Sequence, residues 1–94
     1  MALARVVEFD GVSRERVDQM RQEMEGTPPP EGLPVKELLV LHDADAEKAV
    51  AILFFDSEED YRQADEALNA MPVEDTPGKR SSVDKYDVVH RQTV

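Results

Sequence analysis

Seven apolar residues follow one another from Ala49 to Phe55, and this run constrains the fold more than any other part of the sequence. Successive side chains of a β-strand point to opposite faces, so a strand over this run presents apolar side chains to both faces of its sheet. The run is far shorter than the ~20 apolar residues of a membrane-spanning helix. Each large side chain left in water forgoes about 1.5–3 kcal/mol of burial free energy. The sequence therefore predicts a central strand that must be covered on both faces.

Length, charge and cysteine content limit the class of protein. The 94 residues with 40% apolar content predict a single domain, 1–94. Eleven Lys and Arg against 21 Asp and Glu give a formal charge of −10. This charge repels nucleic acid and anionic membranes, so we expect neither as a partner, and we expect a ligand to be neutral or cationic rather than a polyanion. The absence of cysteine excludes disulfides and thiolate metal sites.

The residues from Met1 to Asp10 lack the basic and then apolar pattern of a secretory signal. We therefore expect a cytoplasmic protein.

The first part of the chain predicts a strand, a helix and a loop. The strand covers Leu3–Phe9 and ends at a turn. Ser13 is the expected N-cap of a helix over Arg14–Glu25. Its apolar side chains recur with helical spacing at Val17, Met20 and Met24. Gly26 and three consecutive prolines end this helix, and Gly26–Pro34 is the expected loop.

The second part predicts a hairpin, a helix and a last strand. Strands over Val35–Asp43 and Lys48–Asp56 flank a short acidic turn, which favours antiparallel pairing. Ser57 is the expected N-cap of a second helix that Pro72 ends. The apolar stripe of this helix consists of Tyr61, Ala64, Leu68 and Met71. A polar loop follows over 73–80, and the last strand is expected over Ser82–Gln92.

This β-α-β-β-α-β order predicts a ferredoxin-like α+β fold, with a four-stranded antiparallel sheet and two helices on one face. The helices can cover only that face, while the strand over Ala49–Phe55 is apolar on both. An uncovered apolar face usually marks an interface, so we expect a homodimer that forms through the open sheet face. The alternative is that the central strands are simply richer in apolar residues. The sequence does not determine which face carries the helices.

The length, the element order and the two-faced sheet resemble the dimeric α+β barrel superfamily, which includes antibiotic-biosynthesis monooxygenases. Residues 49–68 carry the resemblance most clearly (AVAILFFDSEEDYRQADEAL), where a strand passes through Phe55-Asp56-Ser57 into an acid-led helix. It extends loosely from Leu3 to Arg91. The resemblance implies a homodimer with face-to-face sheets and a small-molecule cleft between sheet and helices. Catalytic members use Trp with Asn or His, whereas this chain has no Trp and a single Asn, Asn69.

The two histidines are the candidates for proton chemistry near neutral pH. Residues four apart in a strand share a face, so Tyr86 and His90 can line one wall of a pocket, as candidate catalytic and ligand-binding residues. His42 is a third candidate for ligand binding. The usual strand order of this fold places His42 and His90 at opposite sheet edges. The alternative is that His42 is an exposed strand-end residue and His90 lies on the surface or in an interface.

We expect no metal and no cofactor. The acidic residues of 43–47 resemble a calcium loop, but its sixth and twelfth positions hold Lys48 and Phe54 where Gly and Glu are needed, so a solvated hairpin tip is expected. The carboxylates at 58–60 repel phosphate from the second helix start, and no nucleotide-binding motif occurs.

Two hypotheses about function follow. The first is a small dimeric α+β barrel protein that binds, and in one version transforms, a small partly apolar molecule in a cleft between sheet and helices. The second is a noncatalytic ligand-sensing or assembly module that acts through dimerisation. A shielded pocket holding both Tyr86 and His90 favours the first hypothesis. A filled pocket with both polar side chains in water favours the second.

Overall fold

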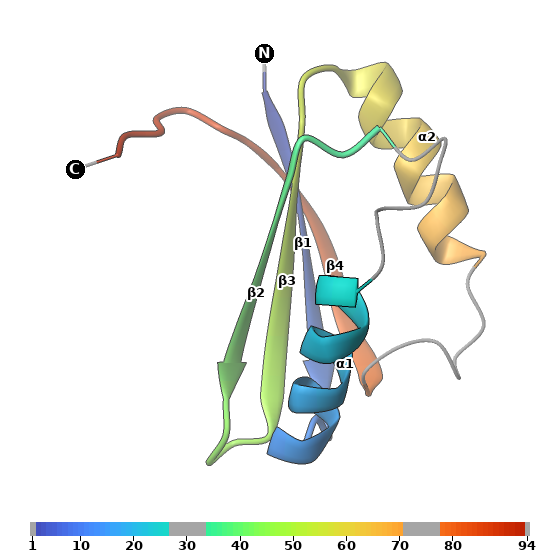
Figure 1. Cartoon of the computed structure of the whole chain (residues 1–94). Coiled ribbons are helices and arrows are strands. Elements are labelled where there is room, and N and C mark those ends of the chain that lie inside the picture. The colour runs from blue at the N-terminus through green and yellow to red at the C-terminus, as the bar shows by residue number, and fades with distance from the viewer. Residues whose placement is uncertain (1, 27–33, 71–77, 94) are drawn as a thin grey trace.

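The computed structural model describes residues 2–26, 34–70 and 78–93. Four strands form one antiparallel sheet in the order β2-β3-β1-β4, and both helices lie on the same side of it (Figure 1). The elements are β1 (Leu3–Asp10), α1 (Arg14–Gly26), β2 (Glu37–Asp43), β3 (Lys48–Phe55), α2 (Glu58–Asn69) and β4 (Lys79–Asp87). This arrangement confirms the ferredoxin-like α+β fold predicted from the sequence.

The strand register determines which side chains face the helices. Leu3 lies opposite Phe55, and Val7 lies opposite Ala51. These odd-numbered side chains of β1 and β3 belong to or pack against the buried core. The even-numbered side chains of the same strands, Val50, Ile52 and Phe54 among them, therefore point to the opposite, open face.

The helix-facing core has two parts. One cluster lies under α2 and consists of Leu3, Leu53, Phe55, Tyr61 and Ala64. The other lies at the opposite end of β1 and consists of Val7, Phe9, Val12 and Ala49. Ala51 packs against both clusters. Arg5 occupies the position of β1 between them, so a charged residue interrupts an otherwise apolar face.

Local capping explains where the helices begin. The Ser57 hydroxyl accepts a hydrogen bond from the backbone N–H of Asp60 at 3.2 Å, and Ser13 accepts one from the N–H of Arg16 at 3.2 Å. The apolar stripe of α2 places Tyr61 edge-on against Phe55, with ring centroids 5.4 Å apart. By contrast, no residue of α1 is buried, and Met24 is 44% exposed.

The last strand differs from the expected Ser82–Gln92. It spans Lys79–Asp87, and its paired residues run along β1 from Asp10 back to Leu3, where β1 begins. After β4, the N–H of Val88 donates to the carbonyl of Ala2 at 2.9 Å, and the chain leaves the sheet. The apolar pair Val88 and Val89 favoured a strand locally, but a strand continues only where a neighbour accepts its hydrogen bonds.

Smaller differences concern the element ends. The second strand begins at Glu37 rather than Val35, and the third ends at Phe55 rather than Asp56. Most of the expected loops at 26–34 and 73–80 lies outside the described residues, as does Met71. Among the described residues, no helix is long and apolar enough to cross a membrane.

The open face of the sheet carries apolar side chains along much of β3 and β2, while Glu8 and Asp10 of β1 lie toward the hairpin end of the same face. Leu39, Leu41 and Tyr86 are exposed on it, and Val50, Ile52 and Phe54 are half-buried. The C-terminal segment covers one end of this face, where the Arg91 guanidinium lies 4.4 Å from the Phe54 ring centroid and forms an ion pair with Glu37. Both α1 and α2 lie on the other side of the sheet, so neither covers the rest of this apolar surface (Figure 1).

The adjacent Phe54 and Phe55 provide a test of this arrangement. Phe55 is 1% exposed under α2, so Phe55→Asp buries an unpaired charge, and we expect a loss of upwards of ~3 kcal/mol and failure to fold. Phe54→Asp lies on the open face, so we expect a soluble, folded and weakened protein. Urea unfolding followed by circular dichroism measures both. Equal destabilisation by the two substitutions would contradict the assignment of the two faces.

Candidate functional site

The structure separates the three sequence-predicted candidates. Tyr86 is 55% exposed on the open face, and His90 lies beyond the end of β4, so the two do not share a strand face. The His90 ring bonds the Gln92 side chain at 3.0 Å and is exposed. His42 is half-buried in β2, and its Nε2–H donates to the carbonyl of Val12 at 2.8 Å. As expected, β2 and β4 form opposite edges of the sheet.

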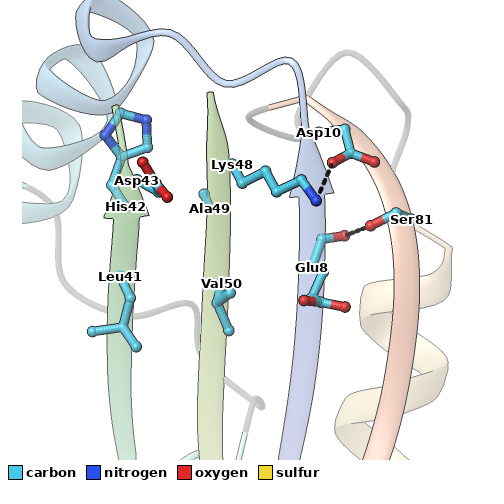
Figure 2. Close-up of a pocket in the computed structure, with 9 residues that line it drawn as sticks. All are labelled: Glu8, Asp10, Leu41, His42, Asp43, Lys48, Ala49, Val50 and Ser81. Carbon is cyan, nitrogen blue, oxygen red and sulfur yellow. Dashed lines mark hydrogen bonds and ion pairs between the residues drawn. The ribbon is translucent and has the colours of Figure 1, made fainter. Parts of the chain in front are cut away.

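A shallow pocket of about 460 Å³ lies on the sheet near the hairpin between β2 and β3 (Figure 2). Its lining consists of Glu8, Asp10, Leu41, His42, Asp43, Lys48, Ala49, Val50 and Ser81. The carboxylates in it already have partners. Asp10 lies 4.0 Å from the Lys48 ammonium, Glu8 accepts from the Ser82 hydroxyl at 2.8 Å, and Asp43 accepts from the backbone of its own turn. The three carboxylates that line this pocket thus have partners within the chain.

A second cleft, of about 370 Å³, lies between α2 and β4 on the helix side of the sheet. It is lined by Glu58, Glu59, Tyr61, Arg62, Asp65 and Lys85. The Lys85 ammonium donates to Glu58 at 2.7 Å and lies 5.2 Å from the centroid of the Tyr61 ring. This cleft therefore has an aromatic wall, Tyr61, and both acidic and basic side chains in its lining.

Three groups of this cleft, Glu58, Lys85 and Tyr61, have shifted pKa values. The hydrogen bond from Lys85 lowers the pKa of Glu58, and the same contact raises the pKa of Lys85. Burial raises the pKa of Tyr61, and the nearby Asp65 carboxylate raises it further. All three shifts hold the groups in their ordinary protonation states near neutral pH, so none of them is prepared as a proton carrier there.

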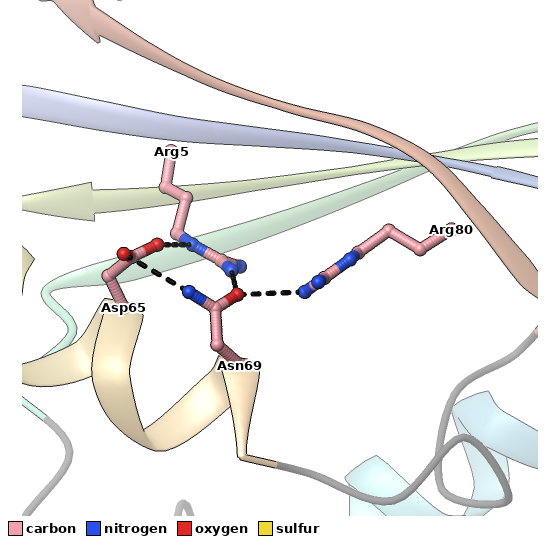
Figure 3. Close-up of polar contacts among 4 residues, drawn as sticks. All are labelled: Arg5, Asp65, Asn69 and Arg80. Atoms are coloured by element: carbon pink, nitrogen blue, oxygen red, sulfur yellow. Dashed lines mark hydrogen bonds and ion pairs between the residues drawn. The ribbon is translucent and has the colours of Figure 1, made fainter.

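A buried arginine connects this cleft to a polar cluster between α2 and the sheet (Figure 3). Arg5 is only 3% exposed, and its Nε donates to Asp65 at 2.8 Å. Its Nη2 donates to the Asn69 side-chain oxygen at 3.1 Å, and Arg80 donates to the same oxygen at 2.9 Å. The Asn69 amide in turn donates to Asp65 at 3.3 Å. Residues from β1, α2 and β4 thus form one network, the Arg5 cluster.

Sequence reasoning missed the Arg5 cluster. Its signal was present, because Arg5 stands between Leu3 and Val7 on the same face of an apolar strand. A charged residue at such a position is rarely buried without a partner. The partners, Asp65 and Asn69, are 60 and 64 residues away in the chain. Among the described residues, no group of three or more His, Cys, Asp or Glu side chains is placed to hold a metal ion.

Comparisons with known proteins place the fold. No family model matches the chain, and no curated protein matches it. The chain is similar in structure to a protein of Chloroflexus aurantiacus J-10-fl proposed to be an antibiotic biosynthesis monooxygenase, with a TM-score of 0.61 and 11% sequence identity. The match covers 99% of this chain and 98% of that one. The chain therefore shares the ferredoxin-like α+β fold of that protein.

The Arg5–Asp65 contact can be tested through the free energy of unfolding of two variants. Removing Asp65 leaves a buried guanidinium without its carboxylate, so we expect Asp65→Ala to cost about 3–5 kcal/mol. Arg5→Met retains most of the side-chain volume and leaves only the partly exposed Asp65 carboxylate, so it should cost less. Chemical unfolding of both variants measures the difference. A larger loss for Arg5→Met would show that the guanidinium stabilises the core by more than its pairing with Asp65.

The Glu58–Lys85 contact makes a prediction about pH. The pKa of Glu58 is lowered, so its contribution to stability is present above 4.5 and is lost as the pH falls through the folded value. The pKa of Lys85 is raised, so its contribution is present below 10.5 and is lost as the pH rises through the folded value. NMR titration of the Glu58 carboxyl should give a midpoint below 4.5 that returns toward 4.5 in Lys85→Met. The same midpoint in both proteins would exclude the contact in solution.

Proposed function

We propose that this chain acts as a homodimer, formed through the open sheet faces, that binds a small, partly apolar molecule between its sheet and its helices. The observation that carries the proposal is the apolar open face. Leu41 and Tyr86 are 54% and 55% exposed there, beside half-buried Val50, Ile52 and Phe54. A continuous apolar surface of this kind is usually an interface. The same surface on a second copy is the occupant that matches it in size and polarity.

The helix side supports the binding of a small molecule. The apolar stripe of α1 is incompletely covered, since Val17 and Met20 are half-buried and Met24 is exposed. On the same side, Leu38 of β2 is also exposed. The cleft between α2 and β4 adds an aromatic wall and polar groups. A partly apolar molecule would bury the exposed apolar side chains of α1 and β2, and it would form hydrogen bonds with the polar groups of the cleft. The likeness to a proposed monooxygenase agrees with this use of the fold.

The positions of the histidines favour binding over catalysis. Tyr86 and His90 both lie in water in the single chain, and neither lines a described pocket. This is the arrangement expected for a noncatalytic ligand-sensing or assembly module, which is the second candidate function. The proposal accordingly assigns no catalytic step to Tyr86, His90 or His42. On the sequence grounds given above, it also places the protein in the cytoplasm, without a nucleic acid or membrane partner.

Sedimentation velocity tests the dimer. We expect the wild-type chain to sediment as a dimer at micromolar concentration, and Leu41→Asp to sediment as a folded monomer, because the new charge lies in the proposed interface. Leu41 is exposed in the single chain, so the substitution should leave the fold intact. The matched control is Val89→Asp, which adds the same charge at a 91% exposed position beyond β4 and should remain dimeric.

Salt provides a second measure of the same interface. Two chains of charge −10 repel each other, so dimerisation should strengthen as the ionic strength rises from about 0.01 M to about 0.15 M and the Debye length falls from about 30 Å to about 8 Å. A wild-type monomer at all these salt concentrations would refute the homodimer. Dimers of unchanged strength in Leu41→Asp would place the interface elsewhere.

A further inference from the structure

Two guanidinium groups meet at one amide oxygen in the Arg5 cluster. Arg5 reaches the Asn69 side-chain oxygen from β1, and Arg80 reaches it from β4 (Figure 3). The two donor distances are 3.1 Å and 2.9 Å, so the two positive charges lie close together. Like charges at such separations repel unless an anion compensates them. The neutral Asn69 oxygen accepts from both groups but supplies no charge.

The carboxylate present compensates only one of these cations. Asp65 pairs with Arg5 at 2.8 Å and accepts from the Asn69 amide on its other oxygen. Among the described residues, no salt bridge joins Arg80 to a carboxylate. Arg5, Asp65, Asn69 and Arg80 together therefore carry one net positive charge, and Arg80 is the exposed member of the four.

The surroundings of the cluster differ in charge from the chain as a whole. The cleft between α2 and β4 joins the cluster at Asp65, which belongs to both. Cleft and cluster together hold four of the eleven Lys and Arg residues against three carboxylates; the cations are Arg5, Arg62, Arg80 and Lys85. Salt screens the field of the −10 chain beyond about 8–10 Å, so the groups in direct contact decide whether a single anionic group binds. One anionic group is thus acceptable where a polyanion is not.

We infer that Asn69 and Arg80, backed by the buried Arg5, recognise the carboxylate of a small, partly apolar molecule. A planar guanidinium matches a planar carboxylate with paired N–H donors, and the Asn69 amide adds a neutral donor beside it. The apolar part of the molecule would lie in the neighbouring cleft between α2 and β4, against the Tyr61 side chain. The inference rests on the small-molecule part of the proposed function and is independent of the homodimer.

The experiment titrates isotope-labelled full-length protein with hexanoate and follows the NMR signals of the Asn69 side-chain amide and the Arg5 Nε–H. Asn69 is the only asparagine of the sequence, so its amide signal is a local reporter. Hexanamide, which has the same chain and no charge, is the matched probe, at constant ionic strength. We expect saturable shifts of both signals with hexanoate, and binding of hexanamide weaker by at least about tenfold, because hydrogen bonds to a charged partner are the stronger ones.

Matched variants locate the site. Arg80→Gln should weaken hexanoate binding at least about tenfold while the fold remains intact, since Arg80 is exposed. Arg21→Gln removes the same charge from an exposed position of α1 and should bind hexanoate like the wild type. Unchanged binding by Arg80→Gln, or no saturable shift in the wild type, would overturn the inference. Equal binding of hexanamide would overturn the carboxylate assignment and leave small-molecule binding standing.

A further pair of substitutions separates an external ligand from the chain's own acidic residues. Glu74 and Asp75 precede Arg80 in the sequence and also carry carboxylates. The double variant Glu74→Gln, Asp75→Asn should bind hexanoate as the wild type does. Binding in the double variant alone would assign the carboxylate to the chain itself and would overturn the inference of an external one.

Discussion

The structure depends on β3, a strand that needs apolar cover on both faces. On the helix side, Leu53 and Phe55 lie under α2 in the first core cluster. On the other side, Val50, Ile52 and Phe54 are covered only by their neighbours in the sheet and by the Arg91 contact at one end. Pairing with β1 and β2 protects both edges of β3, so its open face is the apolar surface that remains.

Local signals were sufficient to predict most of the fold. Ser57 followed by carboxylates marks a helix start wherever it occurs, and the capping bond to Asp60 is present in the structure. The run Ala49–Phe55 similarly predicts a buried strand from its own composition. The end of β4 was not predictable in this way. Val88 and Val89 have the composition of a strand, but β1 begins at Leu3, so the paired residues of β4 end opposite it at Asp87.

The site was harder to predict because its contacts join distant parts of the chain. The proposed link between Tyr86 and His90 used only their spacing of four, which has meaning only within one strand, and β4 ends between them. Asn69 was noted only as a lone asparagine. Its position becomes informative once the packing of α2 brings it to Arg5, and this packing is a property of the whole fold.

The buried Arg5 places a polar cluster inside the helix-facing core of this small sheet. A ferredoxin-like domain of this size can fill its helix side with apolar residues alone, and a buried ion pair rarely stabilises more than such a filling would. Here Arg5 divides the core into one cluster under α2 and another reaching Val12. Asp65 pairs with its charge. The Arg5 Nη2 also donates to the Asn69 side-chain oxygen, which accepts a second hydrogen bond from the exposed Arg80. A chain under selection for stability alone has no need of this connection from core to surface, whereas a site for a charged group gains from a guanidinium that packing holds in place.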